Sequence, residues 1–597
     1  MKKTIRLISI LVLTSVLFSG CHRNTPKNKI IENSKNLNVL YDEFYEGTHR
    51  LYPLNSTFYG DNRYNDLLPN DISRAYMIGI KSFYEKFKEK LSKVDSNNIS
   101  TEDKINVKIL IWECDIQLES FNYKFELMPV NQIFSLHLII SDLAGGKNAQ
   151  PFKTSADYEN WLKRLDAYEI WCDTAIANMR RGIKTGYVLP TPLVEKMIPQ
   201  FDAFCNGPVE KHLFFEPIKN FPAGFSSEDK VRLEKEYREA IANKVIPMHK
   251  RFRDFLKNEY LPYSRKTAGY SDLPDGKKMY EYYIKLNTTT NLSADEIFNI
   301  GIEEVARISK EIEKVKNQVG FKGDNKAFFN YVRNDKELMP YKNPKQVLDH
   351  FNAIHEEIGP KLQQMFDIVP KTQFEIRETE SFREASSGGA EYIIGLPDGS
   401  RPGILYIPVP DAAKYNNFED EDIFLHEGIP GHHYQLSLQL ENQNLPKFRR
   451  EIGYTAYTEG WALYAESLGK ELGLYTDPYQ YLGMLSDEMH RAIRLVVDVG
   501  IHAKGWTREQ AIEYSLNNEA ESESNIVAEI ERYMAYPGQA LAYKIGQLKI
   551  LELRAKAEKS LGSKFDLKEF HDIVLKSGSV PLRILEINVN NWSASKK

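Results

Sequence analysis

The chain lacks the features that mark several common protein classes. Its four cysteines among 597 residues are too few for a disulfide-rich scaffold. No long run of one charge sign stands out, and 78 basic residues nearly balance 83 acidic ones, so no nucleic-acid partner is expected. After the N-terminus, no apolar stretch is long enough to span a bilayer. What remains is 42% apolar residues, enough for a large buried core.

The one long apolar run lies at the N-terminus. The sequence MKKTIRLISILVLTSVLFSGC has a basic start, a short apolar centre and small residues before Cys21, which is typical of a secretory signal. Its FSGC end is similar to a bacterial lipobox, in which the cysteine is lipidated, although Phe18 replaces the usual Leu or Val. We therefore expect residues 1–20 to be a lipoprotein signal peptide. A plain signal peptide or an uncleaved anchor is the alternative.

This N-terminus predicts an extracytoplasmic cell-envelope lipoprotein that touches the membrane only through the lipid on Cys21. His22 rather than Asp follows the cysteine, which is consistent with export to the outer membrane of a host that has one. Residues 21–36 are polar and without periodicity, which is typical of a flexible tether. The other cysteines form no C-x-x-C pair, and Cys114 lies in an apolar helical pattern, so it is predicted to be a buried free thiol.

Helical periodicity dominates the rest of the chain. Ser100, Ser293 and Thr507 each precede apolar residues at helical spacing and have an acid or Gln three residues later, which indicates helix starts. One segment differs: AEYIIGLPDGSRPGILYIPVP has two β-like runs, 392–394 and 404–407, around a Pro-Asp-Gly turn. Because no Pro/Gly/Ser-rich linker divides the body, we expect residues 37–597 to form a single, mostly α-helical domain with two lobes around a cleft.

The segment LHEGIPGHHYQ begins like the zinc-peptidase motif H-E-x-x-H but changes its spacing. That motif places two histidines on one helical face, with the glutamate as general base. Here Pro430 stands where the second histidine is expected, and His432 and His433 follow six and seven residues after His426. In a regular helix six residues turn roughly 600° and seven rise about 10.5 Å. Two nitrogens on one zinc lie only about 3–3.5 Å apart, so no straight helix satisfies either pair.

The proline and its flanking glycines remove this objection. A straight helix is disfavoured because the ring of Pro430 clashes with the carbonyl four residues back. Glycines on both sides permit unusual backbone angles. We therefore predict a bulge that returns His432 or His433 to the metal. The histidine that does not bind zinc is expected to contact substrate or support a ligand.

A third ligand is expected downstream. Zinc sites with two histidines from one motif commonly take a carboxylate from a later helix and leave one position for water. The segment YTEGWALYAESLGKELG offers Glu459 at its start and Glu466 two turns later on the same face. Glu459 is the predicted ligand, with Glu466 as a weaker second candidate, and zinc is the predicted cofactor.

A resemblance to a known family lies in four segments, which are HEGIPGHHYQ, EGWALYAE, RLVVDVGIHAKGWT and RYMAYPGQALAYKIG. They resemble a large bacterial family of uncharacterised proteins, often lipoproteins, with an HExxPGHH motif. The resemblance runs over most of the chain after the tether and is most specific in the last third. That family is in turn similar to gluzincin zinc metallopeptidases of the angiotensin-converting-enzyme and oligopeptidase type.

The resemblance implies a large, mostly α-helical ellipsoid with a deep cleft, zinc at its floor and a small β-hairpin beside the zinc helix. The hairpin at 392–407 would be the edge strand that holds a substrate backbone, which makes Tyr392 a candidate substrate-binding residue. The residues that match the ligands and the base are His426, His432 or His433, Glu459, and Glu427.

Weaker candidates lie in the last two segments. Transition-state stabilisation needs donors aimed at the developing oxyanion. We expect Tyr543 and His502 to be catalytic and Arg532 and Tyr533 to bind substrate; the alternative is core packing, since most buried tyrosines simply satisfy a hydrogen bond. Arg491, Arg494 and Asp498 recur on one helical face. They form either a surface ion-pair ladder or a pocket for a peptide carboxylate.

The leading hypothesis is a lipid-anchored zinc peptidase that hydrolyses short peptides in a closed cleft. One alternative is a zinc hydrolase of another amide or an ester. The other is a non-catalytic lipoprotein that binds peptides. Glu427 argues against this last alternative, because a binding protein needs no base beside the metal.

Overall fold

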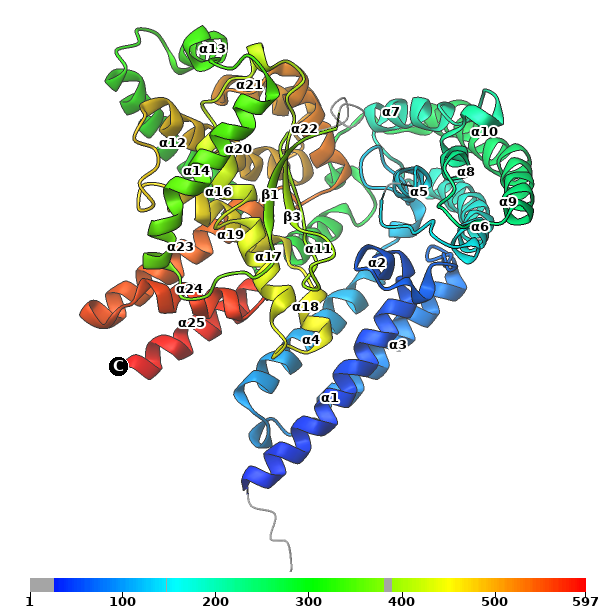
Figure 1. The fold of residues 1–597 in the computed structure, drawn as a ribbon, viewed down its shortest axis with the longest axis horizontal. Coiled ribbons are helices and arrows are strands. Elements are labelled where there is room, and N and C mark those ends of the chain that lie inside the picture. Colours follow the sequence, from blue (N-terminus) through cyan, green and yellow to red (C-terminus); the bar gives the residue numbers. More distant parts are fainter. Residues whose placement is uncertain (1–25, 147, 381–388) are drawn as a thin grey trace, which may run out of the picture.

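The computed structural model describes residues 26–146, 148–380 and 389–597, with side chains from residue 33 onward. The predicted signal peptide and Cys21 lie outside this part. Long helices near the N-terminus, α1 (Pro26–Leu51), α3 (Arg74–Ser92) and α4 (Thr101–Ser120), run side by side (Figure 1). Their faces meet through aromatic rings, with Phe44 of α1 lying 5.3 Å from Phe87 of α3. The short helix α2 (Pro53–Phe58) follows α1.

A second group of helices has a core of its own and lies to one side of the molecule in Figure 1. Its core contains Trp161, Tyr168, Phe201 and Phe252, all essentially inaccessible to solvent. The group consists of α5 (Leu136–Ala144), α6 (Ser155–Thr185), α7 (Thr191–Asp202), α8 (Glu216–Lys219), α9 (Ser227–Ala240) and α10 (Ile246–Asp254).

The remaining helices form the largest part of the molecule and carry the motif. They are α11 (Gly276–Thr288), α12 (Ala294–Gln318), α13 (Asn325–Asn334), α14 (Pro344–Met365), α16 (Asp420–Glu427), α17 (His432–Glu441), α18 (Lys447–Glu451), α19 (Thr455–Ser467), α20 (Pro478–Ala503), α21 (Arg508–Asn518), α22 (Glu523–Ala535), α23 (Leu541–Leu561), α24 (Leu567–Lys576) and α25 (Leu582–Lys596). α12 packs along α20, and α19 packs along α23. The last pair approaches closely at two glycines: a Cβ on Gly460 would lie 2.5 Å from the Cα of Gly546. This close packing fixes α19, the helix that carries Glu459.

A three-stranded sheet lies beside the motif helices. β1 (Phe374–Glu378), β2 (Glu391–Ile393) and β3 (Gly403–Ile407) have the order β1-β3-β2. β2 pairs antiparallel with β3, with Tyr392 opposite Leu405, which confirms the predicted hairpin. β1 pairs parallel with β3 and was not predicted. The mostly α-helical fold class with a small sheet is therefore confirmed.

The helix starts are largely as predicted. The caps at Ser293 and Thr507 are reciprocal, each side chain accepting from the backbone N–H three residues later while that residue's side chain bonds back. Ser100 accepts from the N–H of Asp103, but the Asp103 carboxylate bonds Ser34 and Tyr41 of α1 instead of closing the box. This acid therefore links α4 to α1.

Part of the segment predicted to be a tether is helical. Helix α1 already begins at Pro26, where the sequence predicts an extended tether to residue 36. Asn33 donates to the backbone of Asn98 over 3.0 Å, and Ser34 donates to Asp103 over 2.6 Å. These long-range bonds and the buried Leu37 hold the start of the helix on the body. A segment that lacks helical periodicity can still be helical where tertiary contacts support it.

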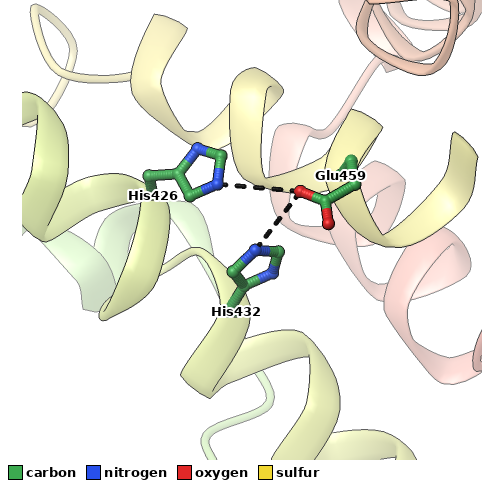
Figure 2. Close-up of side chains that lie close together, drawn as sticks. All are labelled: His426, His432 and Glu459. Atoms are coloured by element: carbon green, nitrogen blue, oxygen red, sulfur yellow. Dashed lines mark ion pairs between the residues drawn. The ribbon is translucent and has the colours of Figure 1, made fainter. Parts of the chain in front are cut away.

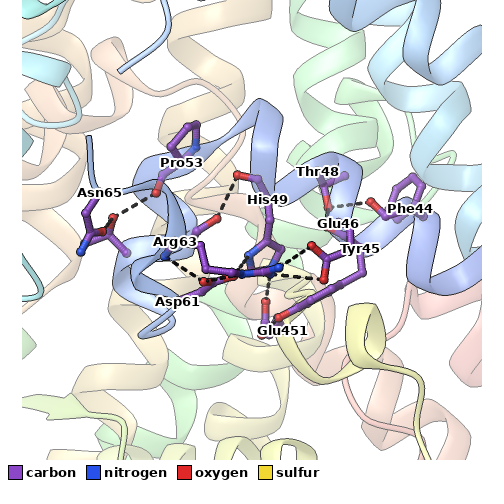
Figure 3. A network of polar contacts seen from close by, with 12 residues as sticks. Phe44, Tyr45, Glu46, Thr48, His49, Pro53, Asp61, Arg63, Asn65 and Glu451 are labelled. Atoms are coloured by element: carbon purple, nitrogen blue, oxygen red, sulfur yellow. Dashed lines mark hydrogen bonds and ion pairs between the residues drawn. The ribbon is translucent and has the colours of Figure 1, made fainter. Parts of the chain in front are cut away.

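Helix α1 is also joined to the motif region. Figure 3 shows Tyr45 and His49 of α1 directed at Glu451, the last residue of α18. The His49 Nε2 lies 2.8 Å from one carboxylate oxygen, and the Tyr45 hydroxyl donates to the other over 3.0 Å. α18 follows α17 in the chain, so this contact connects the N-terminal helix to the candidate site.

Two further expectations concern thiols and membranes. Cys114, Cys172 and Cys205 are buried free thiols, as predicted for Cys114. Of the helices in the described ranges, none combines the length and apolar character needed to cross a membrane.

Candidate metal centre

The unusual histidine spacing is accommodated by a break between two helices. α16 ends at Glu427 and α17 begins at His432. The sequence predicted one helix with a bulge, whereas the structure has two separate helices. Gly431 has φ −73° and ψ −126°, and a Cβ there would lie 1.9 Å from the carbonyl oxygen of His426. The carbonyl of Pro430 accepts a 2.8 Å hydrogen bond from the indole of Trp461. Sterically, only glycine fits at 431, and Trp461 ties the break to α19.

The break brings His426 and His432 together with Glu459 (Figure 2). One carboxylate oxygen of Glu459 lies 3.7 Å from Nε2 of His426 and 3.5 Å from Nε2 of His432. The two imidazole rings stand 4.8 Å apart and almost perpendicular, at 87°. One potential ligand atom from each residue lies within 4.8 Å of the other two.

These three residues fit zinc. A tetrahedral zinc with ligand bonds of about 2.0–2.1 Å places neighbouring ligand atoms roughly 3.3–3.4 Å apart. The distances from Glu459 to the two histidines are close to this value. Nδ1 of His426 lies 2.5 Å from a carboxylate oxygen of Glu466, which directs Nε2 towards the centre of the group. The donor set is therefore two imidazoles and one carboxylate, with one histidine oriented by a second carboxylate.

Electrostatic coupling within the group is strong because His426 is buried and the side chains of His432 and Glu459 are only 12% and 19% exposed. Burial lowers the pKa of His426 well below its usual value, which favours the neutral ring that a metal requires. For His432 burial acts in the same direction, but the charge of Glu459 outweighs it and the pKa is raised. Burial raises the pKa of Glu459, and His432 outweighs that effect, so the Glu459 pKa is lowered.

Glu427 lies beside this group as the predicted base. One of its carboxylate oxygens is 4.0 Å from Nε2 of His426. Burial is the main cause that raises its pKa to about 7, and the charge of Glu459 adds to this effect. The backbone N–H of Tyr392 in β2 donates to the same carboxylate. Glu427 is therefore held between the cluster and the strand, with a proton affinity suited to proton transfer near neutral pH.

His433 lies outside the group. Its Nδ1 is 2.9 Å from the hydroxyl of Tyr392, and its ring packs 4.8 Å from Phe374 of β1. The tandem histidines thus point in different directions, one to the cluster and one to the sheet. Of the two histidines left open by the sequence, the geometry selects His432. The side chain of Tyr392 supports His433, and its backbone is the part that meets Glu427.

Two cavities reach the cluster from different sides. One, of about 420 Å³, lies between α16, α20 and α22 and is lined by His426 and Glu427 together with Arg491, Arg494 and Arg532. The other, of about 440 Å³, is lined by Glu459, Thr455, Tyr536 and Gln539 and by residues 128–134. The ring of Phe134 lies 5.1 Å from that of Tyr536, so the second cavity lies where the 128–134 segment meets α22.

The chain matches the family described as bacterial protein of unknown function (DUF885) over residues 53–589. It belongs to this family. A "putative lipoprotein" from Colwellia psychrerythraea is 30% identical in sequence, with a TM-score of 0.86 over 94% of this chain and 100% of that one. A "putative lipoprotein of unknown function" from Shewanella oneidensis shares the fold, with 18% identity and a TM-score of 0.70 over 92% and 98% of the two chains.

Two other comparisons are uninformative about function. No curated protein matches the chain. A "putative oligoendopeptidase F" from Bacillus anthracis is 11% identical and covers 88% of this chain and 96% of its own, but its TM-score is 0.27, too low to support an argument. Membership of the family therefore assigns no reaction to this chain.

The predicted catalytic role of His502 needs correction. His502 is completely buried; its Nε2 faces the carbonyl of Tyr533 and its Nδ1 accepts from the N–H of Tyr270. Both ring nitrogens are thus used by the backbone, and burial lowers its pKa to about 3. Asp498 is also buried, bonded by the Tyr280 hydroxyl and the N–H of Gly538, so it is part of the core instead of a surface ladder.

The other donors surround Arg494. Tyr533 is buried, and its hydroxyl accepts from Nε of Arg494 and donates to Glu529, so it supports the arginine instead of facing the cavity. The ring of Tyr543 lies 4.5 Å from the Arg494 guanidinium. Arg532 lines the first cavity and pairs with Glu529. The sequence left two alternatives open for Arg491 and Arg494, a surface ion-pair ladder and a carboxylate pocket. Both arginines line the first cavity, and their helical spacing had indicated that they share one face of the helix.

Proposed function

We propose that this protein is a zinc-dependent peptidase. The observation that carries the proposal is the group of His426, His432 and Glu459, which has the donor types and spacing of a catalytic zinc site, with Glu427 beside it. Three protein ligands leave a fourth position for water or substrate. The zinc itself is part of the proposal.

The chemistry follows from the residues around the site. Zinc held there would polarise the scissile carbonyl and lower the pKa of a water. Glu427, which lies beside the group, would take a proton from that water and give it to the leaving amine. Glu466 keeps His426 in the orientation and tautomer that leave Nε2 available. The Tyr543 hydroxyl is a candidate donor to the developing oxyanion.

The surroundings favour an extended peptide as substrate. β2 is the last strand in the order β1-β3-β2 of the described sheet, and the backbone of Tyr392 meets Glu427 from this strand. An extended backbone added beside β2 would therefore pass over the cluster. The cavities of about 420 and 440 Å³ favour short peptides over folded proteins. Lipidation at Cys21 would place this activity outside the cytoplasm, in the cell envelope.

The first test is the metal content of the full chain, extracted in detergent and measured by elemental analysis. We expect about one zinc per chain, lost in His426→Ala, His432→Ala and Glu459→Ala. His433→Ala is the matched control, because this neighbouring histidine lies outside the group, and it should retain zinc. Absence of zinc from the unmutated protein even after reconstitution would reject the metallopeptidase and favour a peptide-binding lipoprotein.

The second test separates an enzyme from a binder. Glu427→Gln should keep zinc and fold but lose turnover of a short-peptide library by about 10²–10⁴-fold, the usual contribution of a general base. Unchanged turnover would show that Glu427 is not the base. A zinc-loaded protein that hydrolyses esters or other amides but no peptides would shift the proposal to that class of substrate.

A further inference from the structure

Helix α20 presents two arginines with unused hydrogen-bonding capacity to the first cavity. Arg491 and Arg494 line it on one face of the helix, opposite His426 and Glu427 of α16. Nη1 of Arg494 and Nε of Arg491 are buried and have no hydrogen-bond partner among the described residues. The Arg494 side chain is only 6% exposed. A buried guanidinium N–H without a partner is costly, so its retention calls for an acceptor.

The position of Arg494 is fixed by its other contacts. Its Nε donates to the Tyr533 hydroxyl over 3.0 Å, and its Nη2 donates to Glu529 over 2.9 Å. The Tyr543 ring stacks against the guanidinium at 4.5 Å. These three contacts come from α22 and α23 and hold the planar group rigidly, with Nη1 unused. Arg494 is thus preorganised to receive a ligand atom.

The charges around Arg494 leave room for an anion. Glu529 pairs with Arg494, with Arg532 and more distantly with His490, so one carboxylate serves two guanidinium groups. Arg491 pairs with Asp487. The other acidic residues of the cavity are Glu419, Asp422, Glu427 and Glu521. Among the described acids of the cavity, Glu529 alone forms an ion pair with Arg494, so Nη1 of this guanidinium stays available to an anion.

The ligand must be small and must lie close to the reacting bond. Arg491 and Arg494 line the same cavity of about 420 Å³ as His426 and Glu427, so a ligand bound at the arginines lies near the cluster. An extended peptide spans about 3.3–3.6 Å per residue. An anion bound at these arginines would thus be separated from the scissile carbonyl by only one or two residues. In a peptide of any sequence, the one anionic group found so near a bond to be cut is the C-terminal carboxylate.

We propose that Arg494, assisted by Arg491, binds the C-terminal carboxylate of the substrate, so that the protein is a carboxypeptidase that removes one or two residues. This inference rests on the proposed peptidase function. The bond broken is the amide C–N bond. Water supplies the oxygen of the new carboxylate and the proton taken up by the new amine, with Glu427 carrying that proton. A guanidinium suits this task because its fork matches a carboxylate.

The test compares a peptide that has a free C-terminal carboxylate with the same peptide as a C-terminal amide. Loss of a charge-assisted hydrogen bond is worth about 10–100-fold, so the unmutated protein should prefer the acid by at least that factor in kcat/KM. Arg494→Gln should raise KM for the acid and leave the amide nearly unchanged, which removes the preference. Arg494→Lys, which keeps the charge but not the fork, should recover part of it. Arg180→Gln, at an exposed arginine of α6, is the control and should change neither substrate.

Two outcomes would overturn the inference. One is equal hydrolysis of acid and amide by the unmutated protein. The other is an equal loss on both substrates in Arg494→Gln, which would show that Arg494 acts on the reacting carbonyl or on the fold. If no peptide is hydrolysed, the proposed function fails, and calorimetric titration of Glu427→Gln with the same pair tests the arginines separately. Tighter binding of the acid, lost with Arg494→Gln, upholds the carboxylate site; equal binding or none rejects it.

Discussion

A single hydrogen bond orients the metal-facing nitrogen of His426. Glu459 and Glu466 stand seven residues apart on α19 and approach the same histidine from different sides. The first faces Nε2 and the second bonds Nδ1. Burial strongly raises the pKa of Glu466, and the nearby acids Asp422 and Asp487 add to this effect. Glu459 and Glu466 lie on the same face of α19 but have different roles. Glu459 is a candidate ligand, and Glu466 positions the imidazole of His426.

Replacing the carboxyl group of Glu466 with an amide should weaken zinc binding without removing a ligand. In Glu466→Gln the amide oxygen can still accept from Nδ1, but the imidazole becomes less basic. Partners of ligating histidines typically change metal affinity by about 10–100-fold, and we expect a loss of that order, measured by competition with a chelator. Glu471→Gln is the control, because this acid is exposed and pairs with Arg554. Unchanged affinity in Glu466→Gln would mean that the bond does not tune the histidine.

At the residue scale, the residue types of the candidate site could be predicted from the sequence, but not the direction in which every side chain points. The pair on α19 could be predicted, because seven residues return to the same helical face. The choice between His432 and His433 could not, since it depends on the backbone angles of the four residues between α16 and α17. His502 lies only two turns from Arg494 on α20, yet it faces the core. Which face of a helix is covered depends on what packs against it.

At the scale of elements, the interrupted helix replaces the straight zinc helix. α16 supplies His426 and Glu427 from its last turn, and α17 supplies His432 from its first residue. The proline and glycines predicted an irregularity here, but not that the helix would stop and restart. The hairpin was predictable from its two β-like runs and the Pro-Asp-Gly turn between them. β1 was not, because its five residues lie apart from any turn signal and pair with β3 only through the tertiary fold.

The helix break gives a prediction for Gly431→Ala. A Cβ at this position would lie 1.9 Å from the carbonyl oxygen of His426, so the backbone must shift and carry His432 away. We expect a destabilisation of about 1–3 kcal/mol, measured by chemical denaturation, together with loss of most of the zinc. Gly453→Ala, in the loop between α18 and α19, is the matched control, because a Cβ there meets nothing within 4 Å. Normal zinc content in Gly431→Ala would show that the break tolerates a side chain.

At the scale of the whole molecule, the N-terminal helices support the candidate site without contributing to it. α1 packs against α3, and its polar residues reach Glu451 at the end of α18 (Figure 3). The segment 128–134, just before α5, lines the cavity that contains Glu459, and Gln132 donates to the backbone of α22. Long-range contacts of this kind cannot be read from local periodicity, which explains why the sequence predicted a tether where a helix forms.

The early start of α1 can be tested against the predicted tether. Replacing residues 26–36 with a Gly-Ser segment of equal length keeps the number of residues between Cys21 and the body but removes the bonds of Asn33 and Ser34. The two bonds together contribute about 2 kcal/mol and the lost helical turns add to this, so we expect the melting temperature of the full chain to fall by about 2–4 °C, followed by circular dichroism. Asn33→Ala combined with Ser34→Ala removes only the two bonds and should give a smaller decrease. An unchanged melting temperature in the Gly-Ser variant would show that this segment is a tether, because a tether adds nothing to the stability of the body.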